Sequence, residues 1–125
     1  MDLYNELNQL ETEEEKYELL IEIGSNLPKL LETQKNNENR IVGCQNRVWL
    51  HFEIKDNIVI IQGESDSRLV SGLLAIVLDI YSLKTKQEIL LVGDKWLNEQ
   101  NINLSITRQK GLDSIVKRIL KIANI

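Results

Sequence analysis

The sequence predicts an α+β domain in which helices pack on one face of a small antiparallel β-sheet. Three observations lead to this prediction: a segment with the two-residue alternation of a strand, a turn followed by a second apolar strand, and flanking segments with helical spacing. The chain has 125 residues, the usual size of one domain. No Ser/Gly-rich linker and no internal repeat divides it, so residues 1–125 are expected to form a single domain.

The strand pattern occupies residues 47–55 and continues after a short turn. Apolar and polar or amphipathic side chains alternate there, with Val48, Leu50, Phe52 and Ile54 on one side and Arg47, Trp49, His51 and Glu53 on the other. Asp56 and Asn57 are suited to a tight turn, and the apolar run 58–61 begins a second strand. These segments together predict a β-hairpin.

Helices are predicted on both sides of the hairpin. Thr12 and Glu15 match a capping box at the start of a helix over residues 12–24. A Ser-Asp-Ser run precedes the widest apolar stripe, residues 69–81, which is predicted to be the core helix. Gly72 lowers the helix propensity of this segment, which indicates close packing against another element. Further helices are expected at residues 29–32, 85–91, 94–100 and 112–123.

The charge of the chain argues against nucleic acid as the main partner. The net charge is −4, whereas phosphate binding requires a basic surface. No apolar run approaches the roughly 20 residues that span a bilayer. The N-terminus is acidic and polar, unlike a secretion signal or a mitochondrial presequence. A cytoplasmic location is therefore the default expectation, and a removed transit peptide stays open.

Cys44 is the only cysteine and the only strong nucleophile of the chain. Gly43 permits a positive φ and lets another backbone approach the sulfur closely. Arg40 and Arg47 flank the cysteine and would lower its pKa if they pointed inward. An unreactive buried thiol is the alternative, and the residue pattern alone leaves both interpretations open.

Other chemistries find less support in the residues. His51, the only histidine, lies roughly 23 Å from Cys44 along an extended strand, which disfavours a Cys–His dyad and a thiol hydrolase. One Cys and one His cannot fill a structural zinc site, and an iron–sulfur cluster requires more thiolates. No Gly-rich phosphate loop is present. We therefore predict no metal and no cofactor, and favour a thiol that carries a group and releases it to another thiol.

Residues 38–50, with the sequence Glu-Asn-Arg-Ile-Val-Gly-Cys-Gln-Asn-Arg-Val-Trp-Leu, resemble the hallmark segment of the SufE family of cysteine desulfuration proteins. The resemblance continues in residues 17–28, 63–74 and 104–112, in the family's order and spacing. It implies a SufE-like domain with a fold shared with IscU-type scaffold proteins. The family often has Gly and Pro between residues 81 and 88, where this chain has Leu83 and Lys86.

The resemblance also implies a function for Cys44. It would accept persulfide sulfur from a PLP-dependent cysteine desulfurase of the SufS or CsdA type, stimulate that enzyme, and pass sulfur to an iron–sulfur scaffold, without independent turnover. The residues expected in the reactive loop or on the partner surface are Arg40, Gly43, Gln45, Asp66 and Arg108. Asp66 could instead cap the core helix, and Arg108 could form a surface ion pair.

Two alternatives and the oligomeric state stay open. The chain could be an allosteric adaptor of a desulfurase in which Cys44 is incidental. It could also be a cluster scaffold, which the single cysteine disfavours. A homodimer is compatible with the sequence.

Overall fold

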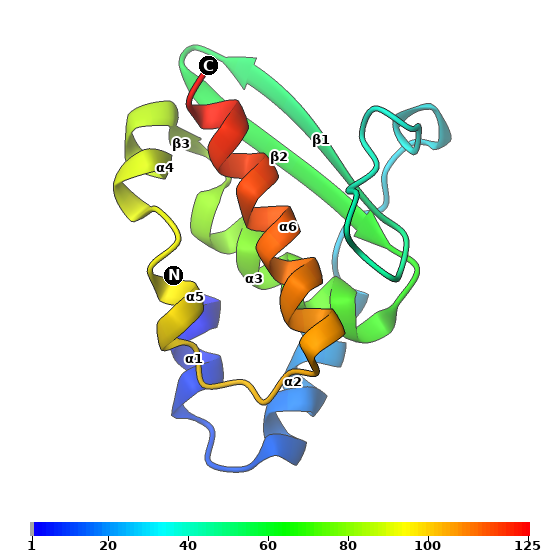
Figure 1. The fold of residues 1–125 in the computed structure, drawn as a ribbon, viewed down its shortest axis with the longest axis vertical. Coiled ribbons are helices and arrows are strands. Elements are labelled where there is room, and N and C mark those ends of the chain that lie inside the picture. The colour runs from blue at the N-terminus through cyan, green and yellow to red at the C-terminus, as the bar shows by residue number, and fades with distance from the viewer. Residues whose placement is uncertain (1) are drawn as a thin grey trace.

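The computed structural model describes residues 2–125 and shows an α+β fold (Figure 1). In chain order the elements are α1 (Asp2–Gln9), α2 (Glu13–Ser25), the 3₁₀-helix η1 (Glu32–Gln34), β1 (Val48–Lys55), β2 (Ile58–Ser65), α3 (Arg68–Tyr81), β3 (Lys84–Thr85), α4 (Lys86–Val92), α5 (Trp96–Glu99) and α6 (Ile106–Ala123). Among these residues, no helix is both long enough and apolar enough to cross a bilayer.

The sheet has the order β1-β2-β3 and is antiparallel throughout. Asp56 and Asn57, the two residues between β1 and β2, have φ values of 53° and 67°. Positive φ at both central residues is the geometry of a two-residue hairpin turn whose twist matches that of the strands. The predicted hairpin is therefore confirmed, and Leu50 pairs with Gly63 on the face that packs against α3.

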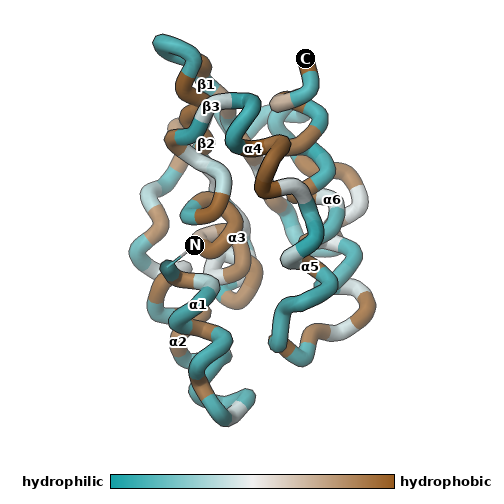
Figure 2. Tube along the Cα trace, turned by 90° about the vertical axis from the view of Figure 1, so that its left-hand side faces the viewer, coloured by the Kyte–Doolittle hydropathy of each residue, from teal (hydrophilic) through white to brown (hydrophobic). Residues whose placement is uncertain are grey.

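Helix α3 is the central element of the fold. It contacts α1, α2, α6 and β2, and its apolar side chains form much of the core. Figure 2 shows hydrophobic residues along α3, which lies between α1 and α2 on one side and α6 on the other. The capping box of α2 forms as predicted, because Thr12 Oγ1 accepts the Glu15 amide at 3.1 Å and the Glu15 carboxylate accepts the Thr12 amide at 3.2 Å.

The crossing of α2 and α3 depends on two glycines. A Cβ atom on Gly72 would lie 2.1 Å from the carbonyl oxygen of Leu20, and one on Gly24 would lie 2.5 Å from the amide nitrogen of Gly72. No side chain fits at either position without separating the helices. The close packing predicted for Gly72 is confirmed, and its partner is the backbone of α2.

Some sequence-based boundaries differ from the structure. The helical turn expected at residues 29–32 is wrong, because the Leu30 amide there donates to the Glu64 carboxylate at 3.0 Å and the short helix forms later, as η1. Helix α6 begins at Ile106 rather than at residue 112, with Ser105 as its N-cap. Helix α1 and strand β3 were not predicted from the sequence.

Leu83 provides a test of the backbone geometry. Its φ is +64°, in the left-handed region, and its side chain is 68% exposed. This conformation costs a residue with a Cβ about 1–2 kcal/mol, and glycine avoids most of that cost while losing more chain entropy on folding. We expect Leu83→Gly to raise the free energy of unfolding by about 0.5–1 kcal/mol in denaturant titrations.

Leu83→Ala is the matched control for this prediction. It removes nearly the same side chain but keeps the Cβ, so it should give no stabilisation. If alanine stabilised the protein as much as glycine, the exposed leucine side chain would be the cause, and the backbone argument would fail.

Candidate functional site

Cys44 lies on a loop directly before the first residue of β1. The cysteine loop, residues 41–47, is closed at its base by hydrogen bonds from the Ile41 amide to the Val48 carbonyl and from the Leu50 amide to the Asn39 carbonyl, each 2.9 Å long. An isolated antiparallel bridge between Arg40 and Trp49 lies between them. The ladder fixes the two stems of the loop and leaves the segment around Cys44 outside the sheet.

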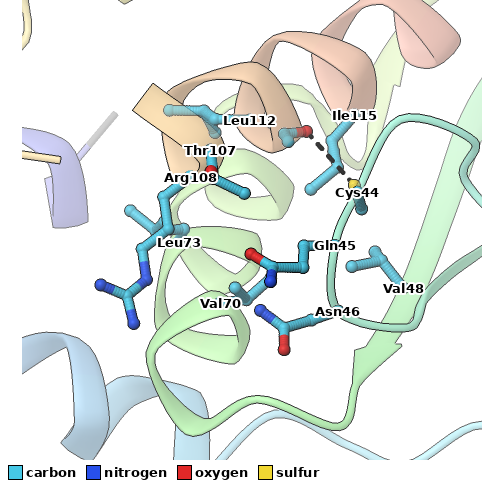
Figure 3. Close-up of a pocket in the computed structure, with 11 residues that line it drawn as sticks. Cys44, Gln45, Asn46, Val48, Val70, Leu73, Thr107, Arg108, Leu112 and Ile115 are labelled. Atoms are coloured by element: carbon cyan, nitrogen blue, oxygen red, sulfur yellow. Dashed lines mark hydrogen bonds between the residues drawn. The ribbon is translucent and has the colours of Figure 1, made fainter. Parts of the chain in front are cut away.

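Helix α6 forms the surface on which the cysteine loop rests. The Cys44 thiol donates to the carbonyl oxygen of Gly111 at 3.5 Å (Figure 3). Gly43 has a φ of +100°, and a Cβ placed on it would lie 2.6 Å from Ser114 Oγ. Small residues on both the loop and the helix therefore allow their backbones to approach, as the sequence indicated for Gly43.

The side of Cys44 that faces the protein borders a small apolar pocket of about 20 Å³, enough for roughly one water-sized group. Its apolar wall comes from β1, α3 and α6, and consists of Val48, Val70, Leu73, Leu112 and Ile115. Gln45, Asn46, Thr107 and Arg108 line its polar side. In Figure 3 the guanidinium of Arg108 points away from Cys44.

The environment of Cys44 favours the neutral thiol. Burial raises the pKa of the Cys44 thiol, and the nearby positive charge of Arg40 lowers it by less, so the pKa lies above its ordinary value. Arg47 does not point toward the sulfur; its Nε donates to Asp66 Oδ2 at 3.0 Å. Of the two flanking arginines, only Arg40 acts in the way the sequence suggested.

Replacing Arg40 should make the resting thiol still less reactive. In Arg40→Gln the lowering effect of the guanidinium is lost, so the pKa of Cys44 rises further and its alkylation by iodoacetamide at neutral pH slows severalfold. The pH profile of alkylation measures this shift. Lys117→Gln is the control and should leave the profile in place; equal profiles for wild type and Arg40→Gln would contradict the assignment.

Asp66 anchors the C-terminal stem of the cysteine loop. Its carboxylate accepts the Arg47 amide at 3.1 Å and the Arg47 Nε at 3.0 Å, and its own amide donates to the Arg47 carbonyl at 3.2 Å. The N-cap of α3 is Ser67, whose hydroxyl accepts the Val70 amide. Asp66 is therefore not the helix cap, and it ties the loop to the start of α3.

The N-terminal stem is held by residues that the sequence analysis did not single out. The Arg118 guanidinium on α6 donates to the carbonyl oxygens of Glu38 at 2.9 Å and Arg40 at 3.3 Å. The Trp49 ring is nearly buried, although the strand pattern placed it on the same side as the polar residues His51 and Glu53. Three cations cover it at 5.6–5.9 Å from the ring centroid, namely Lys35, Arg40 and Arg47.

Two of the predicted site residues, Gln45 and Arg108, remain to be placed. Gln45 and Arg108 lie beside Cys44 at the pocket. Within residues 2–125, no carboxylate lies within the 4.0 Å ion-pair distance of Arg108, so the surface ion pair considered for it is not formed there.

His51 Nε2 lies 3.5 Å from Glu53 Oε1, on the outer face of β1. In the described part of the chain, no three His, Cys, Asp or Glu residues are grouped to hold a metal ion.

The chain is similar to one protein family over nearly its whole length. The family model described as SufE: Fe-S metabolism associated domain matches residues 1–123. An uncharacterized SufE-like protein of Rhizobium meliloti (strain 1021) is 39% identical over 116 residues, covering 85% of this chain and 81% of the relative. An uncharacterized SufE-like protein of Rhizobium etli is 38% identical over 120 residues, which cover 90% of this chain and 80% of the relative.

A solved structure shows the same fold at low sequence identity. The solution structure of a hypothetical protein from Thermus thermophilus superposes with a TM-score of 0.80 at 13% identity. The match covers 98% of this chain and 91% of that one.

Proposed function

Because the chain belongs to the SufE family, whose domain is associated with Fe–S metabolism and a cysteine desulfurase, we propose that Cys44 is its sulfur acceptor. It takes persulfide sulfur from a PLP-dependent desulfurase and releases it to an iron–sulfur scaffold. The observation that carries this proposal is the position of the single thiol, on a loop over an apolar pocket. A persulfide carrier with one cysteine suits the reducing cytoplasm.

The transfer is a thiol exchange that needs no oxidant. The Cys44 thiolate attacks the terminal sulfur of a persulfide on the donor's cysteine, and a new S–S bond forms at Cys44. The S–S bond of the donor breaks, and the donor cysteine leaves as a thiolate. Attack by a thiolate of the recipient later repeats the same exchange in the forward direction and regenerates Cys44.

The resting position of Cys44 protects the sulfur but does not activate it. Burial against the pocket and a raised pKa keep the thiol neutral, and the same apolar surroundings would shield a persulfide from stray reductants. Sulfur transfer therefore requires the cysteine loop to move outward into the donor's active site, where the surroundings of the donor contribute to thiolate formation. Asp66 and Arg118 hold the two stems of the loop, which supports hinges for this movement at the base of the loop.

Counting alanine tests this proposal against the allosteric adaptor. Without reductant, each desulfurase site converts one cysteine to alanine and then stops with sulfur on its own cysteine. A carrier unloads that sulfur, so added chain should raise the amount of alanine by at least about one equivalent per Cys44. An adaptor changes the rate at which alanine appears but not the final amount. An unchanged amount with a competent desulfurase would overturn sulfur acceptance.

A further inference from the structure

A second hollow lies on the other side of the cysteine loop from the apolar pocket. This α6 groove has a volume of about 360 Å³ and is lined by Ile41, Val42, Ser114, Lys117, Arg118 and Lys121. Its loop wall is formed by residues directly before Gly43 and Cys44. A molecule bound in the groove would therefore contact the loop without occupying the pocket that Cys44 faces.

Among the residues that the structure describes, the cations of the α6 groove form no close ion pair, although Lys117 also borders a neighbouring hollow lined by Asp94 and Asp113. Within residues 2–125, no carboxylate lies within 4.0 Å of the amino group of Lys117 or Lys121. Arg118 is bound by the neutral carbonyl oxygens of Glu38 and Arg40, which leave its charge uncompensated. The chain as a whole has a net charge of −4, so this basic region contrasts with the rest of the protein.

An exposed apolar side chain lies beside these cations. Val42 is 88% exposed, and it is two residues from Cys44. An apolar contact surrounded by unpaired charge is typical of a surface that a partner covers, since the apolar contact adds affinity and the charges orient the approach. A partner that fits this surface presents carboxylates around an apolar contact.

We propose that the α6 groove is the docking surface for an acidic patch on the protein that donates sulfur to Cys44. This inference rests on the proposed function. The donor meets the cysteine loop in its resting position, in which Ile41 and Val42 complete the groove. Carboxylates of the donor pair with Lys117 and Lys121, and its apolar contact covers Val42.

The position of the groove along α6 suits this role. Along α6, Arg108 lines the apolar pocket on one side of the cysteine loop, and Gly111 contacts Cys44. Lys117 and Lys121 follow and line the α6 groove on the other side. A donor held at Lys117 and Lys121 is therefore next to the reactive sulfur. Long-range attraction between opposite charges also raises the rate of encounter at low salt.

Charge reversal of the two lysines tests the inference. In the alanine assay without reductant, Lys117→Glu/Lys121→Glu should raise the chain concentration needed for half-maximal loading rate about tenfold at low salt. The final amount of alanine at saturating chain should equal that of wild type. Added salt should bring the half-maximal concentrations of the variant and wild type closer together, because it screens the attraction between the wild-type lysines and the donor. Lys117→Gln/Lys121→Gln should give a smaller change in the same direction.

Lys55→Glu/Lys86→Glu is the matched control, because it changes the net charge equally at residues outside the groove. Its chain concentration for half-maximal loading rate should equal that of wild type. Iodoacetamide, a neutral reagent, should alkylate Cys44 at similar rates in every variant, which shows that the thiol remains equally accessible.

Two results would overturn the docking surface while leaving the proposed function intact. The chain concentration that gives a half-maximal loading rate could be the same for Lys117→Glu/Lys121→Glu as for wild type. Alternatively, loading could be normal while release of sulfur to the recipient is slow, in which case the groove binds the recipient. If the desulfurase formed no more alanine with the wild-type chain than without it, the proposed function itself would fail.

Discussion

Cys44→Ser is expected to abolish sulfur acceptance and the accompanying stimulation of the desulfurase. The serine hydroxyl cannot form a persulfide, so the additional alanine seen with wild type should fall to the level of the desulfurase alone. The fold should persist, because serine is smaller than cysteine and its hydroxyl can donate to the Gly111 carbonyl as the thiol does. Alanine formation with and without the variant measures the effect.

The circular dichroism spectrum and unfolding midpoint of Cys44→Ser provide the control. Both should stay close to wild type, since the changed side chain is half-buried and its one hydrogen bond within residues 2–125 is weak. A folded Cys44→Ser variant that stimulates the desulfurase as strongly as wild type would remove Cys44 from the mechanism. The allosteric adaptor would then be the better account.

Gly72→Ala should cause a large loss of stability. The added Cβ would lie 2.1 Å from the Leu20 carbonyl oxygen, a backbone atom of α2 that cannot move without displacing the whole helix. We expect the overpacking to cost about 3 kcal/mol or more, against a gain in helix propensity of about 1 kcal/mol, so the free energy of unfolding should fall by at least about 2 kcal/mol. Thermal unfolding should show a midpoint lower by roughly 10 °C or more.

Gly111→Ala is the matched control, because Gly111 also lies inside a helix. The nearest atom to its added Cβ would be Cys44 Sγ at 3.5 Å, an ordinary van der Waals contact. This variant should therefore be as stable as wild type or more stable by up to about 1 kcal/mol, from helix propensity alone. Similar stabilities for the two alanine variants would contradict the close crossing of α2 and α3.

Local patterns in the sequence were sufficient for the central part of the fold. The alternation in residues 47–55 predicts β1, the Asp56-Asn57 turn predicts the hairpin, and the apolar stripe predicts α3. Elements held by distant contacts were harder to predict. Helix α1 is fixed by contacts with distant parts of the chain, such as the bond from its Leu3 amide to the Asp79 carboxylate, and the segment before η1 is held by Glu64.

The candidate site was predictable on the cysteine loop and not on the surface beneath it. Gly43 and Cys44 are adjacent in the sequence, so their relation could be inferred directly. Gly111, Ser114 and Arg118 meet the loop only after α6 packs beside it, and no local pattern states that contact. The one available signal was the pair of small residues three positions apart on an amphipathic helix, which permits close approach of another backbone.

Trp49 shows that strand alternation alone does not predict burial. The pattern puts it on the same side as His51 and Glu53, and the register agrees. Its ring is nevertheless nearly buried, because Lys35 and Arg40 come from the segment before β1 and cover it from above. Alternation gives the face of a residue, whereas burial also depends on what the rest of the chain places over that face.

The most direct test of the central claim is the intact mass of the chain after incubation with a cysteine desulfurase, PLP and cysteine, without reductant. We expect a gain of one or more sulfur atoms, located at Cys44 by peptide mapping and removed by reductant. The Cys44→Ser variant should show no gain under the same conditions. An unchanged mass for wild type with an active desulfurase, or sulfur located elsewhere, would contradict the assignment of Cys44 as the sulfur acceptor.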